Sequence, residues 1–162
     1  DRRRTGRAAG GGGAGVNIRP ATSADCAALA AIDRAGNPAP WSAAQFQTAL
    51  NSRFDTVLLA EHQGRPAAFI VWQTVADESE LHLIATAPES RRLGLTAALM
   101  QCWFEAAAAQ SVRRLLLEVR AANLPAQNLY RRHGFTECGR RRDYYSLPDG
   151  TREDAVLMEK PC

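Results

Sequence analysis

Apolar and polar residues recur with two different periods along this chain, and each period predicts a type of element. Over residues 93–110, apolar side chains return every three or four positions, which is typical of a half-buried helix. Its apolar positions are Leu95, Leu99, Cys102, Trp103 and Ala106. Residues 113–119 instead read RRLLLEV, and this continuous apolar run predicts a central strand covered on both faces.

Capping and turn residues divide the rest of the chain into further strands and helices. Ser42 is placed to begin a helix that runs over Leu50, and residues 63–65 predict a hairpin turn. The predicted strands are 16–19, 55–62, 66–75, 79–86, 113–119, 135–147 and 151–159. The other predicted helices follow the caps at 22–25 and run over 93–110 and 123–132. This order predicts a mixed α/β sheet of about seven strands with about four helices.

The length of 162 residues fits one domain, and the net charge is concentrated at its N-terminal end. Residues 1–15, DRRRTGRAAGGGGAG, carry the whole net charge of +3. Such a segment cannot bury enough apolar surface to offset its chain entropy, so we expect a disordered tail before one domain over 16–162. A basic arm that touches RNA is the alternative. The neutral body argues against a nucleic-acid binder that relies on a broad basic face.

The cysteines and the hydropathy of the chain exclude several classes of protein. The cysteines are Cys26, Cys102, Cys138 and Cys162. None has metal-ligand spacing, so we expect no metal, and Cys102 is expected to be a buried free thiol. Free cysteines of this kind indicate a reducing, cytoplasmic compartment. No apolar run approaches the about 18–20 residues that span a bilayer, so we expect no membrane partner.

A predicted strand, a loop and a helix start follow one another over residues 81–97, and this segment is a candidate anion site. Gly94 at the helix start lets a ligand approach the backbone closely, and the first N–H groups of a helix have no partners. Together with the helix dipole they suit a phosphate group, to which Arg91 and Arg92 add charge. The glycine spacing matches neither a P-loop nor a dinucleotide fingerprint. An ordinary turn with exposed arginines is the alternative.

Two further residues are candidates for proton transfer. Glu118 stands inside an apolar strand, where a carboxylate loses hydration and its pKa tends to rise, which suits a general base. Tyr130 follows Asn123 by about two helical turns, so both side chains share one face. A tyrosine hydroxyl can donate a proton. The alternatives are an ion-paired glutamate, an N-cap asparagine and a core tyrosine.

Together these segments resemble the GCN5-related N-acetyltransferase (GNAT) superfamily, over roughly residues 16–160. The resemblance is carried by Arg91-x-x-Gly94-x-Thr96 at a helix start, by the strand with Glu118, and by Asn123 followed by Leu129-Tyr130-x-x-x-Gly134-Phe135. Other stretches are similar to the bacterial ribosomal-protein-alanine N-acetyltransferases of the RimI type. They are Pro40-Trp41-Ser42, residues 116–121 (LLEVRA), and residues 142–145 (RDYY) with residues 149–155 (DGTREDA).

The resemblance implies a fold, a reaction and a set of roles. The implied GNAT fold has mostly antiparallel strands and a central parallel pair at the acetyl-CoA site. Glu118 matches the general base, Tyr130 matches the general acid, and the amine attacks the acetyl thioester directly. The positions that match acetyl-CoA contacts are Ile84, Ala85, Thr86, Arg92, Leu93, Gly94, Leu95, Thr96, Ala97 and Asn123. The implied partner is the N-terminal alanine of a small-subunit ribosomal protein, with no specific nucleic acid.

Two threonines depart from the pattern of the superfamily. Thr96 stands where the loop has its second glycine, although its hydroxyl could contact phosphate. Thr86 stands where an apolar residue is usual, and Ala87-Pro88 lacks the usual acidic residue before proline.

The acceptor and some neighbouring charges leave alternatives open. A small-molecule amine, a non-catalytic CoA-binding module and an RNA-binding protein that uses its basic tail are the other candidate functions. The run at residues 140–142 is either a solvated strand edge or a site for CoA phosphate or RNA. Asp77, Glu78 and Glu80 precede or enter the cofactor strand, and they predict an acidic rim that favours a basic second residue in the acceptor.

Overall fold

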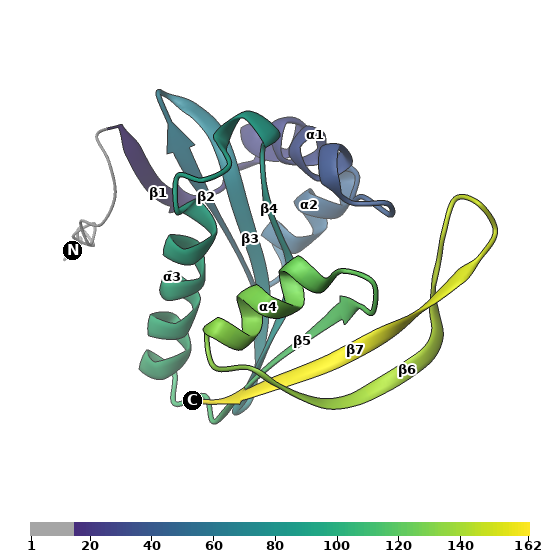
Figure 1. Ribbon diagram of the computed structural model, residues 1–162. Helices are drawn as coiled ribbons and strands as arrows, with labels where there is room; N and C mark the ends of the chain where they lie inside the picture. Colours follow the sequence, from purple (N-terminus) through teal and green to yellow (C-terminus); the bar gives the residue numbers. More distant parts are fainter. Residues whose placement is uncertain (1–14) are drawn as a thin grey trace.

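Seven strands form one mixed sheet in the computed structural model, which describes residues 15–162 (Figure 1). The strands are β1 (Val16–Pro20), β2 (Asp55–His62), β3 (Arg65–Val75), β4 (Glu78–Thr86), β5 (Arg114–Arg120), β6 (Thr136–Ser146) and β7 (Arg152–Pro161). They pair in the order β1-β2-β3-β4-β5-β7-β6. All neighbours are antiparallel except β4 and β5, so the predicted sheet and its central parallel pair are confirmed. The predicted tail lies outside the described residues, apart from Gly15.

Four helices accompany the sheet, as the capping residues predict. They are α1 (Cys26–Gly36), α2 (Ala43–Asn51), α3 (Leu95–Ala109) and α4 (Leu124–Arg132), with short 3-10 turns at η1 (Ser23–Asp25) and η2 (Pro88–Ser90). Ser42 caps α2, because its hydroxyl accepts a hydrogen bond from the Gln45 N–H at 3.2 Å. Helix α3 begins at Leu95 rather than at 93, because Gly94 has a left-handed backbone with φ of 73°.

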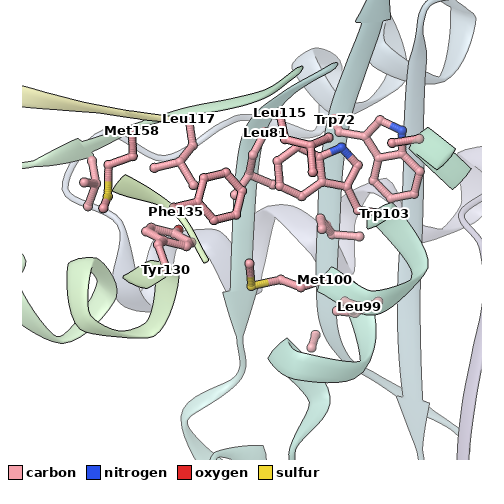
Figure 2. Packing of buried hydrophobic residues seen from close by; sticks show 14 of the residues in the cluster. Trp72, Leu81, Leu99, Met100, Trp103, Leu115, Leu117, Tyr130, Phe135 and Met158 are labelled. Carbon is pink, nitrogen blue, oxygen red and sulfur yellow. The ribbon is translucent and has the colours of Figure 1, made fainter. Parts of the chain in front are cut away.

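A hydrophobic core fills each face of the sheet. On one face, Met100 and Trp103 of α3 form a cluster with Leu81 and Leu117 of the sheet, as Figure 2 shows. The Trp103 indole N–H donates to the Ser79 hydroxyl at 2.8 Å, which satisfies the one polar atom of this buried ring. Helices α1 and α2 cover the other face, where the buried side chains include Phe46, Leu59, Phe69 and Val71.

Strand β5 has one buried face, although its sequence predicts two. Leu115, Leu117 and Val119 are buried in the core on the α3 side, whereas Leu116 and Glu118 between them are partly exposed. Helices α1 and α2 pack mainly on β2, β3 and β4. They therefore leave the second face of β5 open, and this face carries Glu118.

The two parallel strands separate halfway along β4. Their pairing ends at Leu81 with Leu117. At the same point the register between β3 and β4 shifts by one residue, and His82 is the extra residue on β4. Such a bulge bends its strand and ends regular pairing, so β4 and β5 diverge beyond it (Figure 1).

The last two strands form the predicted hairpin, with its turn at residues 147–151. Figure 1 shows this hairpin extending past the rest of the sheet. Strand β6 is an edge strand, and the arginines at residues 140–142 on it are all exposed.

Two further predictions, on membrane-spanning segments and on cysteine burial, can be compared with the structure. Within residues 15–162 the longest helix, α3, has 15 residues, and no helix there is long and apolar enough to cross a membrane. Cys26 is buried, whereas Cys102 is only half-buried. The predicted burial of Cys102 is wrong because the buried face of α3 is centred on Leu99 and Trp103, and Cys102 lies at its margin.

Candidate active site

A cavity of about 900 Å³ opens where β4 and β5 diverge. Its lining comes from the end of β4, the first turn of α3, the start of α4, the loop at residues 37–41 and residues 145–147. Of the site residues predicted from the sequence, all but one line this cavity. The exception is Leu93, which is 42% exposed to solvent and does not line the cavity.

The end of β4 offers an unpaired backbone edge to the cavity. Ile84, Ala85 and Thr86 pair with β3 on one edge through Ile70, Phe69 and Ala68 in register. Their other edge faces the gap left by β5, whose pairing with β4 stops at Leu81. Because extended ligands add to such an edge through main-chain hydrogen bonds, this segment suits a linear amide-containing chain.

The predicted anion site lies at the N-terminus of α3, whose geometry suits an anion. Gly94 is its N-cap and has no side chain to cap the helix, and no acidic residue lies in the first turn. The N–H groups of residues 95–97 therefore remain available to a ligand. A Cβ at Gly94 would meet no atom within 4 Å, so the backbone is open to close approach, and its φ of +73° favours glycine as well. Arg91 and Arg92 also line this end of the cavity.

Glu118 lies on the open face of β5 and is held by an arginine of the hairpin. Its side chain is 21% exposed, and Oε1 lies 3.2 Å from Nε of Arg141. Glu118 is therefore only partly buried, because strand alternation puts its side chain on the face opposite Leu117 and Val119. Glu118 is ion-paired, as the alternative interpretation predicts, and the same carboxylate also lines the cavity.

Tyr130 belongs both to the core and to the cavity. It is 7% exposed, and its ring packs edge-on against Phe135 with centroids 6.1 Å apart (Figure 2). Burial, with a smaller contribution from Tyr145, raises the pKa of Tyr130 to about 12. Its hydroxyl is therefore protonated at neutral pH and able to donate, and Tyr130 lines the cavity from the face of the sheet opposite Glu118.

Asn123 caps α4 and also reaches the cavity. Its side-chain oxygen accepts a hydrogen bond from the Ala126 N–H at 3.3 Å, so the structural alternative for this residue is realised. The amide nitrogen has no part in the cap, and it is the atom that could serve a ligand.

Asp33 is a site residue that the sequence reasoning missed. It is only 2% exposed and lines the cavity, and its Oδ2 accepts a hydrogen bond from the Trp41 N–H at 2.8 Å. Burial raises the pKa of this carboxyl, and the hydrogen bonds from Trp41 and Asn37 oppose the rise. A signal was available, because Asp33 falls on the same helical face as the buried residues Cys26 and Leu29.

The loop that Asp33 holds lines the cavity with aromatic groups. Trp41 packs edge-on against Phe46, with centroids 5.4 Å apart, and lies 6.5 Å from the ring of His82. Tyr145 of the hairpin also lines the cavity, and burial, followed by the nearby Glu118 carboxylate, raises its pKa to about 12. This part of the cavity is therefore aromatic, with the two carboxyl groups of Asp33 and Glu118.

The predicted acidic rim does not belong to this cavity. Asp77, Glu78 and Glu80 line a separate depression together with Gln73 and Leu116. They stand at or just before the opposite end of β4 from Thr86, and the eight residue steps from Glu78 to Thr86 cover about 26 Å. The prediction that these residues form a rim of the site is therefore wrong, and the preference for a basic second residue stays a prediction without this structural support.

Comparisons of this chain with protein families, with curated proteins and with solved structures all find acetyltransferases. The acetyltransferase (GNAT) family matches residues 26–135. A protein named [ribosomal protein bS18]-alanine N-acetyltransferase from Escherichia coli is 38% identical over 130 residues, which cover 80% of this chain and 86% of that protein. The crystal structure of the ribosomal-protein-S18-alanine N-acetyltransferase from Escherichia coli has a TM-score of 0.83 at 35% identity and covers 90% of this chain and 93% of that chain.

A more distant neighbour shares the fold alone. The crystal structure of Arabidopsis thaliana NAA60 in complex with acetyl-CoA has a TM-score of 0.80 at 20% identity, and the match covers 90% of this chain and 98% of that chain. The overall fold is therefore kept at low sequence identity.

Proposed function

The chain belongs to the acetyltransferase (GNAT) family, and from this membership we propose that it acetylates the N-terminal α-amine of a ribosomal protein. Enzymes of this family use acetyl-CoA as the acetyl donor. In the proposed reaction Glu118 is the general base and Tyr130 the general acid, and both line one cavity. When bound, acetyl-CoA supplies a thioester whose carbonyl carbon takes up the amine and whose sulfur leaves as a thiolate.

Backbone groups are proposed to hold the co-substrate. The unpaired edge of β4 at residues 84–86 suits the amide-containing pantetheine arm, and the N–H groups at the start of α3 suit its diphosphate. The backbone openness at Gly94 supports this fit, since a diphosphate must approach the loop closely. Arg91 and Arg92 add charge at the same end, and Asn123 adds an amide donor.

Glu118 is proposed to take the proton from the acceptor amine. An α-amine has a pKa of about 7.7–8.0, against about 10.4 for a lysine side chain, so a carboxylate deprotonates it more readily. The partly exposed ion pair with Arg141 is worth little free energy, about 0–1 kcal/mol. A protonated amine that enters the cavity can therefore replace Arg141 as the partner of Glu118, directly or through a water.

Tyr130 is proposed to stabilise the departing thiolate. With a pKa of about 12 its hydroxyl stays protonated, and burial lets it donate a hydrogen bond without competition from bulk water. Its position on α4, across the gap from Glu118, supports a division of labour in which base and acid act on opposite sides of the reacting carbon.

The acceptor side of the cavity supports a peptide N-terminus. The Trp41 loop, Tyr145 and Leu147 form a partly apolar wall that suits a small first side chain and its neighbour. A relative at 38% identity is named for the alanine of ribosomal protein bS18, which supports a ribosomal protein with N-terminal alanine as the acceptor.

The observation that carries the proposal is the convergence of Glu118 and Tyr130, from opposite faces of the sheet, on the gap between β4 and β5. The test is to incubate the protein with acetyl-CoA and purified small-subunit ribosomal proteins and to measure intact masses. We expect one protein with N-terminal alanine to gain one acetyl group. Acetylation of small amines alone, with every ribosomal protein unmodified, would contradict the proposed acceptor.

A further inference from the structure

Thr86 and Thr96 both depart from the pattern that the sequence resembles, and the structure joins them. Their hydroxyl oxygens lie 3.0 Å apart, so one hydroxyl donates a hydrogen bond to the other. Thr86 is the last residue of β4, and Thr96 is the second residue of α3. The bond ties the end of the strand to the first turn of the helix.

This pair has one O–H group to spare. A threonine hydroxyl has one hydrogen and can both donate and accept. When one hydroxyl donates to its neighbour, the accepting hydroxyl keeps its own hydrogen for a further partner. Within residues 15–162 neither hydroxyl has another hydrogen-bond partner, and both residues line the cavity. The spare hydrogen is therefore available to a ligand.

The surroundings of Thr96 decide where this hydrogen points when a ligand is present. Thr96 lies among the free N–H groups at the start of α3, whereas Thr86 lies at the end of the strand. An anion at the helix start attracts the hydrogen of Thr96, and Thr96 then accepts from Thr86. Hydrogen bonds in such a chain polarise one another, so each strengthens the next.

We propose that Thr96 donates to the diphosphate of acetyl-CoA and that Thr86 is a positioning residue that holds the Thr96 hydroxyl in place for this contact. The inference rests on the proposed function, since acetyl-CoA brings the diphosphate. Free rotation about χ1 gives a threonine three staggered positions, and the bond from Thr86 selects one of them.

The test measures dissociation constants by calorimetry for acetyl-CoA and for acetyl-pantetheine, which lacks the diphosphate. Thr86→Val keeps the shape of the side chain and removes the hydroxyl, and Thr86→Ser is the matched control that keeps it. We expect Thr86→Val to weaken acetyl-CoA binding about threefold to tenfold, the size of one hydrogen bond, with acetyl-pantetheine unaffected. Thr86→Ser should bind both ligands as the parent does.

A second comparison isolates the route of the effect. In a Thr96→Val background, Thr86→Val should cause no further loss of acetyl-CoA affinity, because Thr86 acts through Thr96. A loss that persists there would overturn the positioning role, as would equal weakening of both ligands or unchanged binding of acetyl-CoA. Should Thr86→Val fail to fold, Thr96→Val against Thr96→Ser gives the same contrast between the two ligands.

Acetyl-CoA binding by the parent protein distinguishes a failure of this inference from a failure of the proposed function. A parent that does not bind acetyl-CoA would overturn the proposed function. A parent that binds acetyl-CoA with the same affinity as every threonine variant would overturn the role of the pair alone.

Discussion

The two ends of the cavity are built from different parts of the polypeptide. At the proposed acetyl-CoA end, most of the ligating groups are backbone atoms, at residues 84–86 and at the N–H groups of residues 95–97, to which the side chains of Arg91, Arg92, Thr96 and Asn123 are added. At the proposed acceptor end, the groups are side chains, chiefly Glu118, Asp33 and Tyr145. The backbone part of a site depends on the fold, whereas the side-chain part depends on particular residues.

This difference explains where the chain can vary. Thr86 and Thr96 depart from the pattern that the sequence resembles, and the start of α3 nevertheless keeps free N–H groups for the proposed diphosphate. A change at the acceptor end removes a chemical group that the backbone cannot replace. Substitutions at the two ends should therefore separate into effects on acetyl-CoA affinity and effects on turnover or acceptor use.

The largest effect is expected at Glu118. Glu118→Gln keeps the size of the side chain but cannot take a proton, so the rate of transfer should fall about 10²–10⁴-fold. Acetyl-CoA affinity should be unchanged, since the backbone end is untouched. Steady-state rates together with calorimetric binding check both statements, and near-parental turnover would remove Glu118 from the role of base.

Tyr130→Phe should have the next largest effect. It removes the hydroxyl and keeps the ring against Phe135, so we expect turnover to fall about 10²-fold, at the low end for acid–base groups. Thermal unfolding should stay close to that of the parent. A variant whose lost activity is fully accounted for by unfolding would show that Tyr130 serves the core alone.

A smaller effect is expected at Asp33, which holds the acceptor loop. Asp33→Ala leaves the Trp41 N–H without its acceptor, so the KM for the acceptor should rise about fivefold to tenfold, with acetyl-CoA affinity unchanged. Asp33→Asn is the matched control, because its side-chain oxygen can still accept from Trp41. An equal rise in KM for both variants would contradict this positioning role.

The smallest effect concerns stability, and its sign follows from the raised pKa of Asp33. Because burial disfavours the ionised form, the native state is penalised at pH values above the unfolded pKa of about 3.9. The free energy of unfolding of Asp33→Asn should therefore match or exceed that of the parent at neutral pH. The difference should shrink as the pH falls below about 4, and urea unfolding at several pH values measures it.

Much of the fold could be predicted from the sequence, because the signals that define it are local. The apolar run at 113–119, the cap at Ser42 and the glycine at 94 each act within a few residues, and the strands and helices that they predict are present. Glu118 could be singled out for the same reason, since a charge within an apolar strand is visible without a partner.

The residues that were missed or misplaced depend on contacts between distant segments. The burial of Asp33 follows from packing and from the Trp41 loop, and the exposure of Glu118 follows from the open second face of β5. The Arg141 partner comes from another strand, β6. The acidic rim was misplaced because closeness to Thr86 in sequence along β4 becomes a large distance in an extended strand.

The central claim is that the cavity acetylates an N-terminal α-amine, and two peptides test it most directly. One begins with a free alanine, and the other has the same sequence with its α-amine blocked and an internal lysine added. After incubation with the protein and acetyl-CoA, mass spectrometry should show one acetyl group on the first peptide and almost none on the second. Acetylation of the lysine peptide at a comparable rate would contradict the claim.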